Sequence, residues 1–278
     1  MPPGLLGESS MTGLGEEAVE RLGSPLAKQV DFHEEIGSTQ ERARELARGT
    51  PGAPHGTIVI SKVQKGGRGR LARRWGSPPG GLWFSLVLRP RIPAHLAPRF
   101  TQAAAVGVAK ALWYFGVEAR IKWPNDLLVV GTGEAHTEGK ICGILAEAGG
   151  GNGHLDFVLL GIGVNANLDP TDLDVPDREV TTLRSELGRD VDLVELLGAS
   201  LSKLENELEK IEDFDDILDD WRALNCTLGR LVRVERFGEL LEGRAADLTP
   251  EGALLLETPE GTVEVFEGEV EHLRQEGT

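Results

Sequence analysis

The segment QKGGRGRLARRW, residues 64–75, lies between two apolar segments, GTIVISKVQ at 56–64 and GLWFSLVLRP at 81–90. The flanking segments are rich in β-branched and aromatic residues and are bounded by glycine and proline, as strands commonly are. Glycines let a backbone wrap closely around a ligand, and guanidinium groups match phosphate and carboxylate oxygens. We therefore predict two strands joined by an anion-binding loop.

Other glycine-rich motifs do not describe this loop. It has neither the GxxxxGK[ST] spacing of a P-loop nor the GxGxxG spacing of a dinucleotide-binding turn. An RGG-type RNA-binding segment is a poor match, because the loop lies between strands of an acidic protein. Trp75 ends the loop, where its indole either stacks on a purine or is buried in the core.

The charge of the chain is uneven. Its net charge is −16, yet residues 46–117 contain eleven lysines and arginines and no aspartate or glutamate. Such an acidic chain repels nucleic acid over most of its surface, so we expect no nucleic-acid partner. A positive region in a negative protein is typical of a site for an anionic ligand, with a basic surface loop as the alternative.

Length and composition indicate a soluble, cytoplasmic globular protein. At about 150 residues per domain, 278 residues fit one large domain or a medium and a small one. No apolar run approaches the roughly 18 residues of a membrane span, and we find no signal-peptide pattern. Cys142 and Cys226 lie far apart without a CxxC motif, which argues against a disulfide framework or a zinc site.

Helix and strand signals alternate in the first three quarters of the chain. Ser38 or Thr39 caps one helix, and Asp190 caps a long amphipathic helix with leucines three and four residues apart. Residues 101–115 and 215–224 also read as helices. Short apolar runs that end at Gly, Asn or Pro predict central strands with functional ends in ARIKWPNDLLVV (119–130), GKICGILAEA (139–148) and LDFVLLGIGVNAN (155–167).

The chain divides into three regions. Residues 1–30 are Gly-rich and acidic, and we expect an N-terminal arm too short for a helix-turn-helix module. Residues 31–224 form the main domain. Residues 225–278 change to short alternating segments separated by turns, which predicts a small SH3-like β-barrel.

Two polar groups of residues interrupt the predicted strands. Asn125 and Asp126 follow a rigid Trp-Pro pair, where they hydrogen-bond a base or hold Mg²⁺ near phosphates; an ordinary turn is the alternative. Lys140 precedes an apolar strand, where it neutralises a carboxylate or a phosphate. A surface lysine at the start of a strand is the default for that position.

Together and in this order, these segments resemble the biotin protein ligases. The resemblance rests on GSTQ (37–40), GGRGRLARRW, KWPNDLL, GKICGILAE and GIGVNAN, and it covers about residues 32–273. It implies an α+β fold, in which a catalytic domain of the class II aminoacyl-tRNA synthetase kind, with a mixed sheet and helices, precedes the SH3-like β-barrel. Some members carry an N-terminal winged helix and act as repressors, whereas we expect this chain to be a ligase without a DNA-binding domain.

The resemblance also implies a two-step reaction. The carboxylate of biotin attacks the α-phosphate of ATP, in the presence of Mg²⁺, and gives biotinyl-5'-AMP and pyrophosphate. A lysine of a biotin carboxyl carrier protein, a subunit of acetyl-CoA carboxylase, then takes the biotinyl group. The physiological acceptor, the order of substrate binding and the oligomeric state, with a homodimer as one option, stay open.

Residue roles follow from the same resemblance. The implied biotin ligands are Ser38, Thr39, Gln64, Gly67, Arg68, Lys140 and Gly143; the implied ATP ligands are Arg68, Arg70, Trp75, Asn125, Lys140 and Asn165; the implied catalytic residues are Lys140, Arg68 and Arg70; and Asp126 is a candidate Mg²⁺ ligand. Two positions depart from the family pattern. Ala72 stands where glycine is frequent, and Gln40 stands where asparagine is common.

Three alternatives remain at this point. A lipoate or octanoyl transferase shares the fold, but its RRxSGGGAV-like stretch is not found in this sequence. A nucleic-acid-binding protein would use the basic loop and the barrel, and its binding to DNA would survive physiological salt. A non-catalytic biotin sensor would release no pyrophosphate from ATP and biotin.

Overall fold

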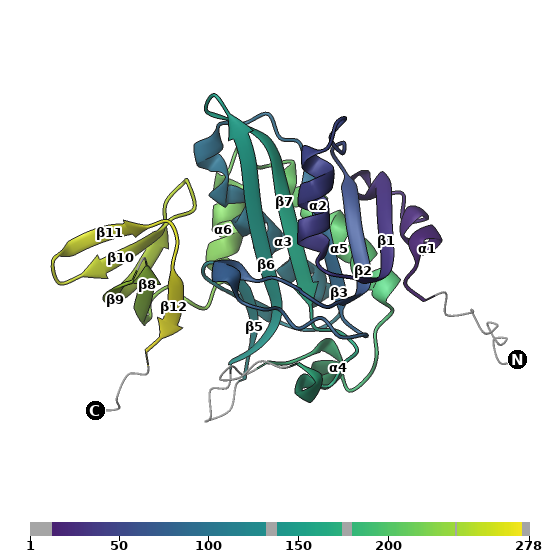
Figure 1. The fold of residues 1–278 in the computed structure, drawn as a ribbon. Coiled ribbons are helices and arrows are strands. Elements are labelled where there is room, and N and C mark those ends of the chain that lie inside the picture. Colours follow the sequence, from purple (N-terminus) through teal and green to yellow (C-terminus); the bar gives the residue numbers. More distant parts are fainter. Residues whose placement is uncertain (1–12, 132–137, 174–179, 237, 274–278) are drawn as a thin grey trace, which may run out of the picture.

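A computed structural model of the chain describes residues 13–131, 138–173, 180–236 and 238–273. A main domain is built around a large sheet, and a smaller domain of strands lies beside it (Figure 1). The helices are α1 (Glu16–Glu20), α2 (Thr39–Arg48), α3 (Pro98–Tyr114), α4 (Leu183–Leu187), α5 (Leu193–Leu208) and α6 (Asp215–Leu224). The strands are β1 (Gln29–Ile36), β2 (Thr57–Gln64), β3 (Leu82–Leu88), β4 (Ala119–Lys122), β5 (Asp126–Val130), β6 (Glu138–Gly151), β7 (His154–Val164), β8 (Leu231–Arg236), β9 (Glu239–Leu248), β10 (Leu254–Thr258), β11 (Gly261–Val265) and β12 (Glu269–His272).

The main sheet is mixed, as the resemblance implied. Its seven strands have the order β1-β2-β3-β7-β6-β5-β4. β1 and β2 run parallel, and the other neighbouring pairs are antiparallel. β6 and β7 are internal strands, but β4 lies at the edge of the sheet, which corrects the prediction of a central strand for that segment.

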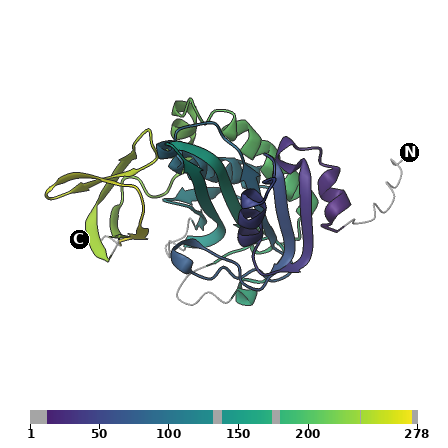
Figure 2. The same cartoon turned by 45° about the horizontal axis from the view of Figure 1, so that its top comes forward.

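Alternate residues of the strands face two different helical layers, since side chains on a strand alternate in direction. Ile58 and Ile60 of β2 belong to the large hydrophobic core that includes residues of α3 and α5. Val59, between them, packs in a smaller core with Ala43 and Ala47 of α2. α2 therefore covers one face of the sheet, and α3 and α5 cover the other (Figures 1 and 2).

The helical layer behind the sheet contains one close crossing and one cluster of paired charges around the buried Glu207. A Cβ atom at Gly107 of α3 would lie 3.0 Å from Cα of Leu204, so the glycine allows α3 and α5 to approach. Lys110 Nζ lies 2.7 Å from Glu207 Oε1 and 2.5 Å from Asp220 Oδ2. Asp220, an acidic residue of α6, thus pairs with α3 across the helical layer.

Helix boundaries follow local capping groups. Ser38 Oγ accepts the hydrogen bond of Glu41 N and begins α2, as predicted. The long helix α5 begins after Asp192, whose Oδ1 accepts from Val194 N at 2.7 Å, and not after Asp190, which pairs with Arg184. The spacing of the leucines locates the helix but does not decide which of two neighbouring aspartates caps it.

The described part of the N-terminal region packs onto the main domain. Residues 1–12 of the predicted arm lie outside the described residues. Val19 of α1 and Leu26 are buried in the large core, and α1 contacts β1 and α5. The prediction of an arm did not anticipate this packing.

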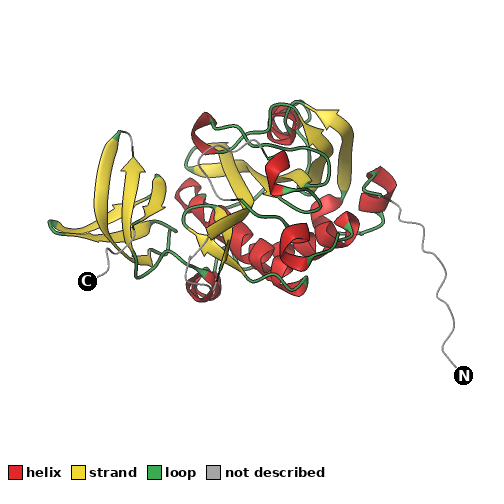
Figure 3. Cartoon of the chain, turned by 90° about the horizontal axis from the view of Figure 1, so that it is seen from below, coloured by secondary structure: helices red, strands yellow, loops and turns green. Residues whose placement is uncertain are grey.

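The C-terminal domain is an antiparallel sheet with the strand order β11-β10-β9-β8-β12. It consists of strands and loops (Figure 3). The pairings of the described residues leave β11 and β12 as edges, so the sheet is not closed as the predicted barrel would be. Among the residues that the structure describes in both domains, no helix is long and apolar enough to cross a membrane.

Candidate active site

A cavity of about 1420 Å³ lies on the α2 face of the main sheet. It is lined by the start of α2, the loop after β2, the facing ends of β5, β6 and β7, and residues of the C-terminal domain. Its lining includes most of the residues selected from the sequence: Ser38, Thr39, Gln64, Arg68, Arg70, Trp75, Asn125, Asp126, Lys140, Gly143 and Asn165. Gly67 is buried beside the cavity, where its carbonyl oxygen accepts a hydrogen bond from Trp75 N.

One end of the cavity is polar and firmly held. Thr39 donates its backbone N–H to Gln64 Oε1 at 2.8 Å, and its hydroxyl lies 2.9 Å from Ser85 Oγ. Gln64 Nε2 donates to Ser77 Oγ at 2.8 Å. Ser38, Thr39 and Ser85 are at most 4% exposed. This set of fixed donors and acceptors suits a small polar ring.

The floor of the cavity is made of glycine. Gly143 of β6 pairs with Gly163 of β7, and Gly161 lies two residues earlier on the same face of β7. A Cβ atom would lie 2.8 Å from the Trp75 ring at Gly143 and 2.5 Å from Trp75 Nε1 at Gly163. At Gly161 it would lie 2.6 Å from Gln40 Oε1. The missing side chains leave a slot along the sheet, in which the Trp75 indole packs over Gly143 and Gly163 and the Gln40 amide lies over Gly161.

A lysine and an aspartate face each other at the other end of this slot. Lys140 Nζ lies 2.5 Å from Asp126 Oδ1, and it lies 4.9 Å from the centroid of the Trp75 ring. The side chains of Lys140 and Asp126 are only 12% and 19% exposed. A cation held in so little water interacts strongly with any anion that enters.

The turn between β4 and β5 is fixed against β6. Asn125 Nδ2 donates to the carbonyl of Ile144 at 2.6 Å, and Ile144 N donates back to the carbonyl of Asn125 at 3.0 Å. Arg70 points from the loop to this turn and lies 3.5 Å from Asn125 Oδ1. Burial lowers the pKa of Arg70 below its ordinary value, against the opposing effect of Asp126 and two glutamates. A half-buried guanidinium of this kind gains from an anionic ligand.

The glycine-arginine loop folds back on itself. Gly69 N donates to the carbonyl of Arg73 at 2.8 Å, and Trp75 N donates to that of Gly67 at 2.9 Å. Arg68 pairs with Glu41 of α2, and Arg73 pairs with Glu269 of β12. The loop therefore contacts both domains, and it brings cations to the mouth of the slot.

Comparison with known proteins connects this geometry to a family. The biotin/lipoate A/B protein ligase family matches residues 34–165, and the biotin protein ligase C-terminal domain matches residues 227–273. The chain is 33% identical over 275 residues to the bifunctional ligase/repressor BirA of Bacillus subtilis. The alignment covers 97% of this chain and 80% of that protein. The chain belongs to the biotin protein ligase family.

Two further relatives extend the similarity. A biotin--[acetyl-CoA-carboxylase] ligase of Paracoccus denitrificans is 32% identical over 245 residues, 83% of this chain and 97% of that protein. The structure of the Aquifex aeolicus biotin protein ligase in complex with biotin and ATP aligns with a TM-score of 0.72 and 28% identity, covering 89% of this chain and all of that chain. The predicted family and fold class are confirmed.

Asn165 lies deeper in this ligase than the other selected residues. Its side chain is 1% exposed, and Nδ2 donates to the carbonyl oxygens of Lys140 and Thr181, at 3.1 Å each. It therefore braces the backbone that carries Lys140. Its predicted contact with the nucleotide stays a prediction.

Several site residues escaped the sequence reasoning. Ser85 is the one polar residue in the run LWFSLVL, and Gly161 and Gly163 alternate on one strand, so both signals were present in the sequence. Gln40 was noted only as a departure, yet it bridges α2 to Glu147 of β6 at 3.1 Å. The lining residues of the C-terminal domain, such as His272, had no local signal.

Proposed function

We propose that this biotin protein ligase activates biotin with ATP as biotinyl-5'-AMP and transfers the biotinyl group to a lysine of a biotin carboxyl carrier domain. The observation that carries the proposal is one slot with two different ends. The Thr39–Gln64 network lies at one end, the Lys140–Asp126 pair lies at the other, and the glycine floor joins them. Biotin has a fused polar ring, an apolar chain and a terminal carboxylate, and these match the polar end, the glycine floor and the lysine end in turn.

Biotin binds with its ring at the polar end. Ser38, Thr39 and Gln64 hydrogen-bond the ureido group, together with the backbone of Gly67 and Arg68. The valeryl chain lies on the floor at Gly143 and against Trp75. This orientation directs the carboxylate toward Lys140.

In the first step, a carboxylate oxygen of biotin attacks the α-phosphorus of ATP, and the bond to the leaving pyrophosphate breaks. Lys140, Arg68 and Arg70 stabilise the negative charge that gathers on the phosphate oxygens, because preorganised donors act most strongly in a site that excludes water. Asn125, Trp75 and Asn165 hold the nucleoside side. The loop from β2 shields the mixed anhydride from hydrolysis.

A magnesium ion would enter with ATP. Among the described residues, no group of three or more His, Cys, Asp or Glu side chains gathers to hold a metal. Mg²⁺ is usually held by one or two carboxylates with phosphates and water, so the single carboxylate of Asp126 fits such an ion. The bound ion would supply further positive charge beside the phosphates.

In the second step, the neutral amine of the carrier lysine attacks the carbonyl carbon of the anhydride, AMP leaves, and the amine loses a proton. The match of residues 227–273 to a biotin protein ligase domain supports biotin over lipoate as the substrate. We propose a catalytic domain at 31–224 and a C-terminal domain at 225–278, of which 274–278 lie outside the described residues. A cytoplasmic location, with no nucleic-acid partner, agrees with this assignment.

The direct test of the first step is biotin-dependent release of pyrophosphate from Mg·ATP. We expect release with biotin and a much lower rate with lipoate or with no acid. Faster release with lipoate would assign the chain to the lipoate branch, and no release with either acid would leave only a binding role.

A further inference from the structure

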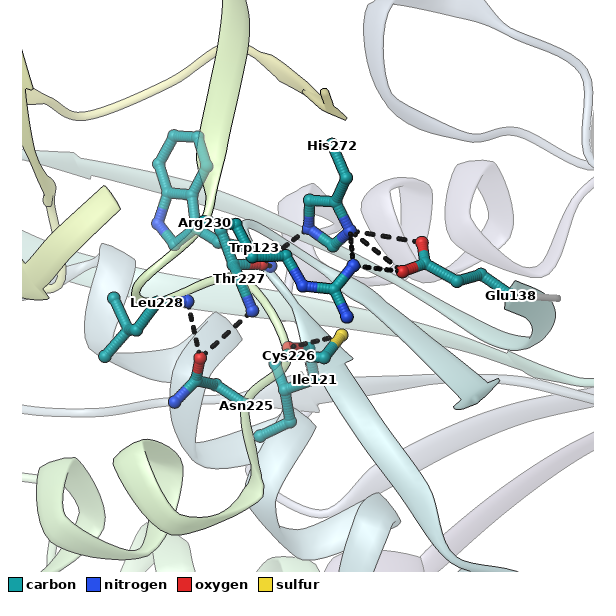
Figure 4. Close-up of polar contacts among 9 residues, drawn as sticks. All are labelled: Ile121, Trp123, Glu138, Asn225, Cys226, Thr227, Leu228, Arg230 and His272. Carbon is teal, nitrogen blue, oxygen red and sulfur yellow. Dashed lines mark hydrogen bonds and ion pairs between the residues drawn. The ribbon is translucent and has the colours of Figure 1, made fainter. Parts of the chain in front are cut away.

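His272, on the last strand of the C-terminal domain, connects the catalytic domain to the segment that follows helix α6. Its Nδ1 lies 3.1 Å from both carboxylate oxygens of Glu138, at the start of β6. Its Nε2 lies 3.3 Å from the hydroxyl of Thr227. Figure 4 shows the imidazole between these two groups.

Both residues that His272 contacts are close to residues of the active site. Glu138 lies two residues before Lys140 on β6, so both side chains face the cavity. Thr227 Oγ1 accepts the backbone N–H of Trp123 at 3.1 Å, immediately before the turn that presents Asn125 and Asp126. Nδ1 of His272 also lies 3.1 Å from Nη1 of Arg230, which donates to the same Glu138 carboxylate. With a proton on Nδ1 directed at Glu138, one chain of donors runs from Trp123 through Thr227 and His272 to Glu138.

The surroundings hold this imidazole in place. The side chain of His272 is 7% exposed, and Thr227 is fully buried. Arg230 donates to Glu138 Oε1 at 2.5 Å. The linker between the domains is fixed as well, because Cys226 N donates to the carbonyl of Ile121 on β4 at 2.9 Å. Movement of the imidazole would leave buried polar groups without partners, which is costly.

We propose that His272 is a positioning residue for adenylation: it sets the spacing between the start of β6 and the Trp123–Asp126 turn, and thereby the geometry of the Lys140–Asp126 pair. This role rests on the proposed function. The polar end of the slot is built from α2, β2 and β3, and its hydrogen bonds involve none of these residues. His272 therefore acts on the nucleotide half of the site and not on the biotin half.

The test compares His272→Ala, His272→Asn and the control His95→Ala, an exposed histidine outside the cavity. We expect His272→Ala to lower kcat for biotin-dependent pyrophosphate release about tenfold or more, since small misplacements of catalytic groups have effects of this size. Biotin affinity, measured by calorimetry without ATP, should stay within twofold of the unmodified protein. His272→Asn places an amide N–H near the position of Nδ1 and should recover most of kcat, and His95→Ala should behave as the unmodified protein.

Three outcomes would overturn the proposal. These are an unchanged kcat in His272→Ala, a parallel loss of biotin affinity and kcat, and an Asn variant as slow as the Ala variant. A parallel loss would show a general structural role. If the unmodified protein releases no pyrophosphate with biotin, the proposed function itself fails, and the positioning role fails with it.

Discussion

The ammonium group of Lys140 lies 2.5 Å from Oδ1 of Asp126, where β5 and β6 run side by side at the end of the glycine floor. The aspartate pairs with the lysine and holds its ammonium group at the slot, while the two side chains are only 12% and 19% exposed. An entering carboxylate or phosphate competes with Asp126 for this cation. Lys140 is therefore the group most directly placed to act on the reacting anions.

Replacement of Lys140 by alanine should slow adenylate formation by about 100- to 1,000-fold, the usual effect of one preorganised donor at a developing charge. The fold should remain, because Asp126 keeps 19% exposure and contact with water. Pyrophosphate release measures the rate, and circular dichroism checks the fold. A folded variant with near-normal release would remove Lys140 from the site.

The arginine loop should retain the intermediate. Arg70 is half-buried and contacts Asn125, so Arg70→Gly should loosen the loop and release biotinyl-AMP into solution several-fold faster while the first step continues. Escaped adenylate is detected as biotin on lysines of an unrelated protein. Arg91→Gly, at an exposed position outside the cavity, is the matched control.

Hydrogen exchange of residues 65–75 tests the same account by a second route. We expect stronger protection with biotin and ATP together, because the anionic ligands would hold the loop cations that otherwise pair with Glu41 and Glu269. Equal protection in both states, or unchanged escape from Arg70→Gly, would show that other residues shield the intermediate.

The glycine floor should not tolerate side chains. In Gly143→Ala the new Cβ would meet the Trp75 ring at 2.8 Å. Overpacking of this kind costs about 1–3 kcal/mol, and we expect displacement of the Trp75 indole to weaken biotin binding. Gly151→Ala on the same strand has open space around its Cβ and should bind biotin normally. Equal affinities of the two variants in calorimetry would contradict the slot.

The junction between the domains should respond to acid in a defined range. Burial would raise the pKa of Glu138, but hydrogen bonds and charge from His272 and Arg230 lower it from 4.5 to about 2. Because the folded pKa is the lower one, the carboxylate stabilises the fold above pH 4.5 and loses this effect as the pH falls toward 2.

Glu138→Gln measures this contribution. We expect the variant to be less stable by about 1–3 kcal/mol near neutral pH. The difference in urea unfolding free energy should narrow between about pH 5 and pH 2, since the Glu138 carboxyl of the unfolded chain is protonated near pH 4.5 and that of the folded protein only near pH 2. The assigned contacts would be contradicted if the two proteins had the same unfolding free energy near neutral pH. They would also be contradicted if the difference in unfolding free energy stayed constant as the pH fell.

The sequence predicted those parts of the fold that depend on local patterns. Helix α6 has the predicted bounds, and Ser38 caps α2 as expected. Composition cannot choose between Asp190 and Asp192 as a cap, because both are good capping residues and the first turn decides between them. It also cannot show that β4 is an edge strand, which depends on strand order.

The site was predictable where functional residues form a continuous motif. The loop from Gln64 to Trp75 and the turn at Asn125 and Asp126 are such motifs, and the cavity brings them together. The contact between Glu138 and His272 joins residues 134 positions apart. No local pattern marks such a pair, since it exists only after the two domains have docked.

The central claim is the transfer of biotin, and mass spectrometry of an acceptor tests it most directly. A biotin carboxyl carrier domain is incubated with the protein, biotin and Mg·ATP, and with the Lys140→Ala variant in parallel. We predict one added biotinyl group on a single lysine of the carrier, dependent on both biotin and ATP and nearly absent with the variant. An unmodified carrier after reaction with the folded, unmodified protein would contradict the assignment.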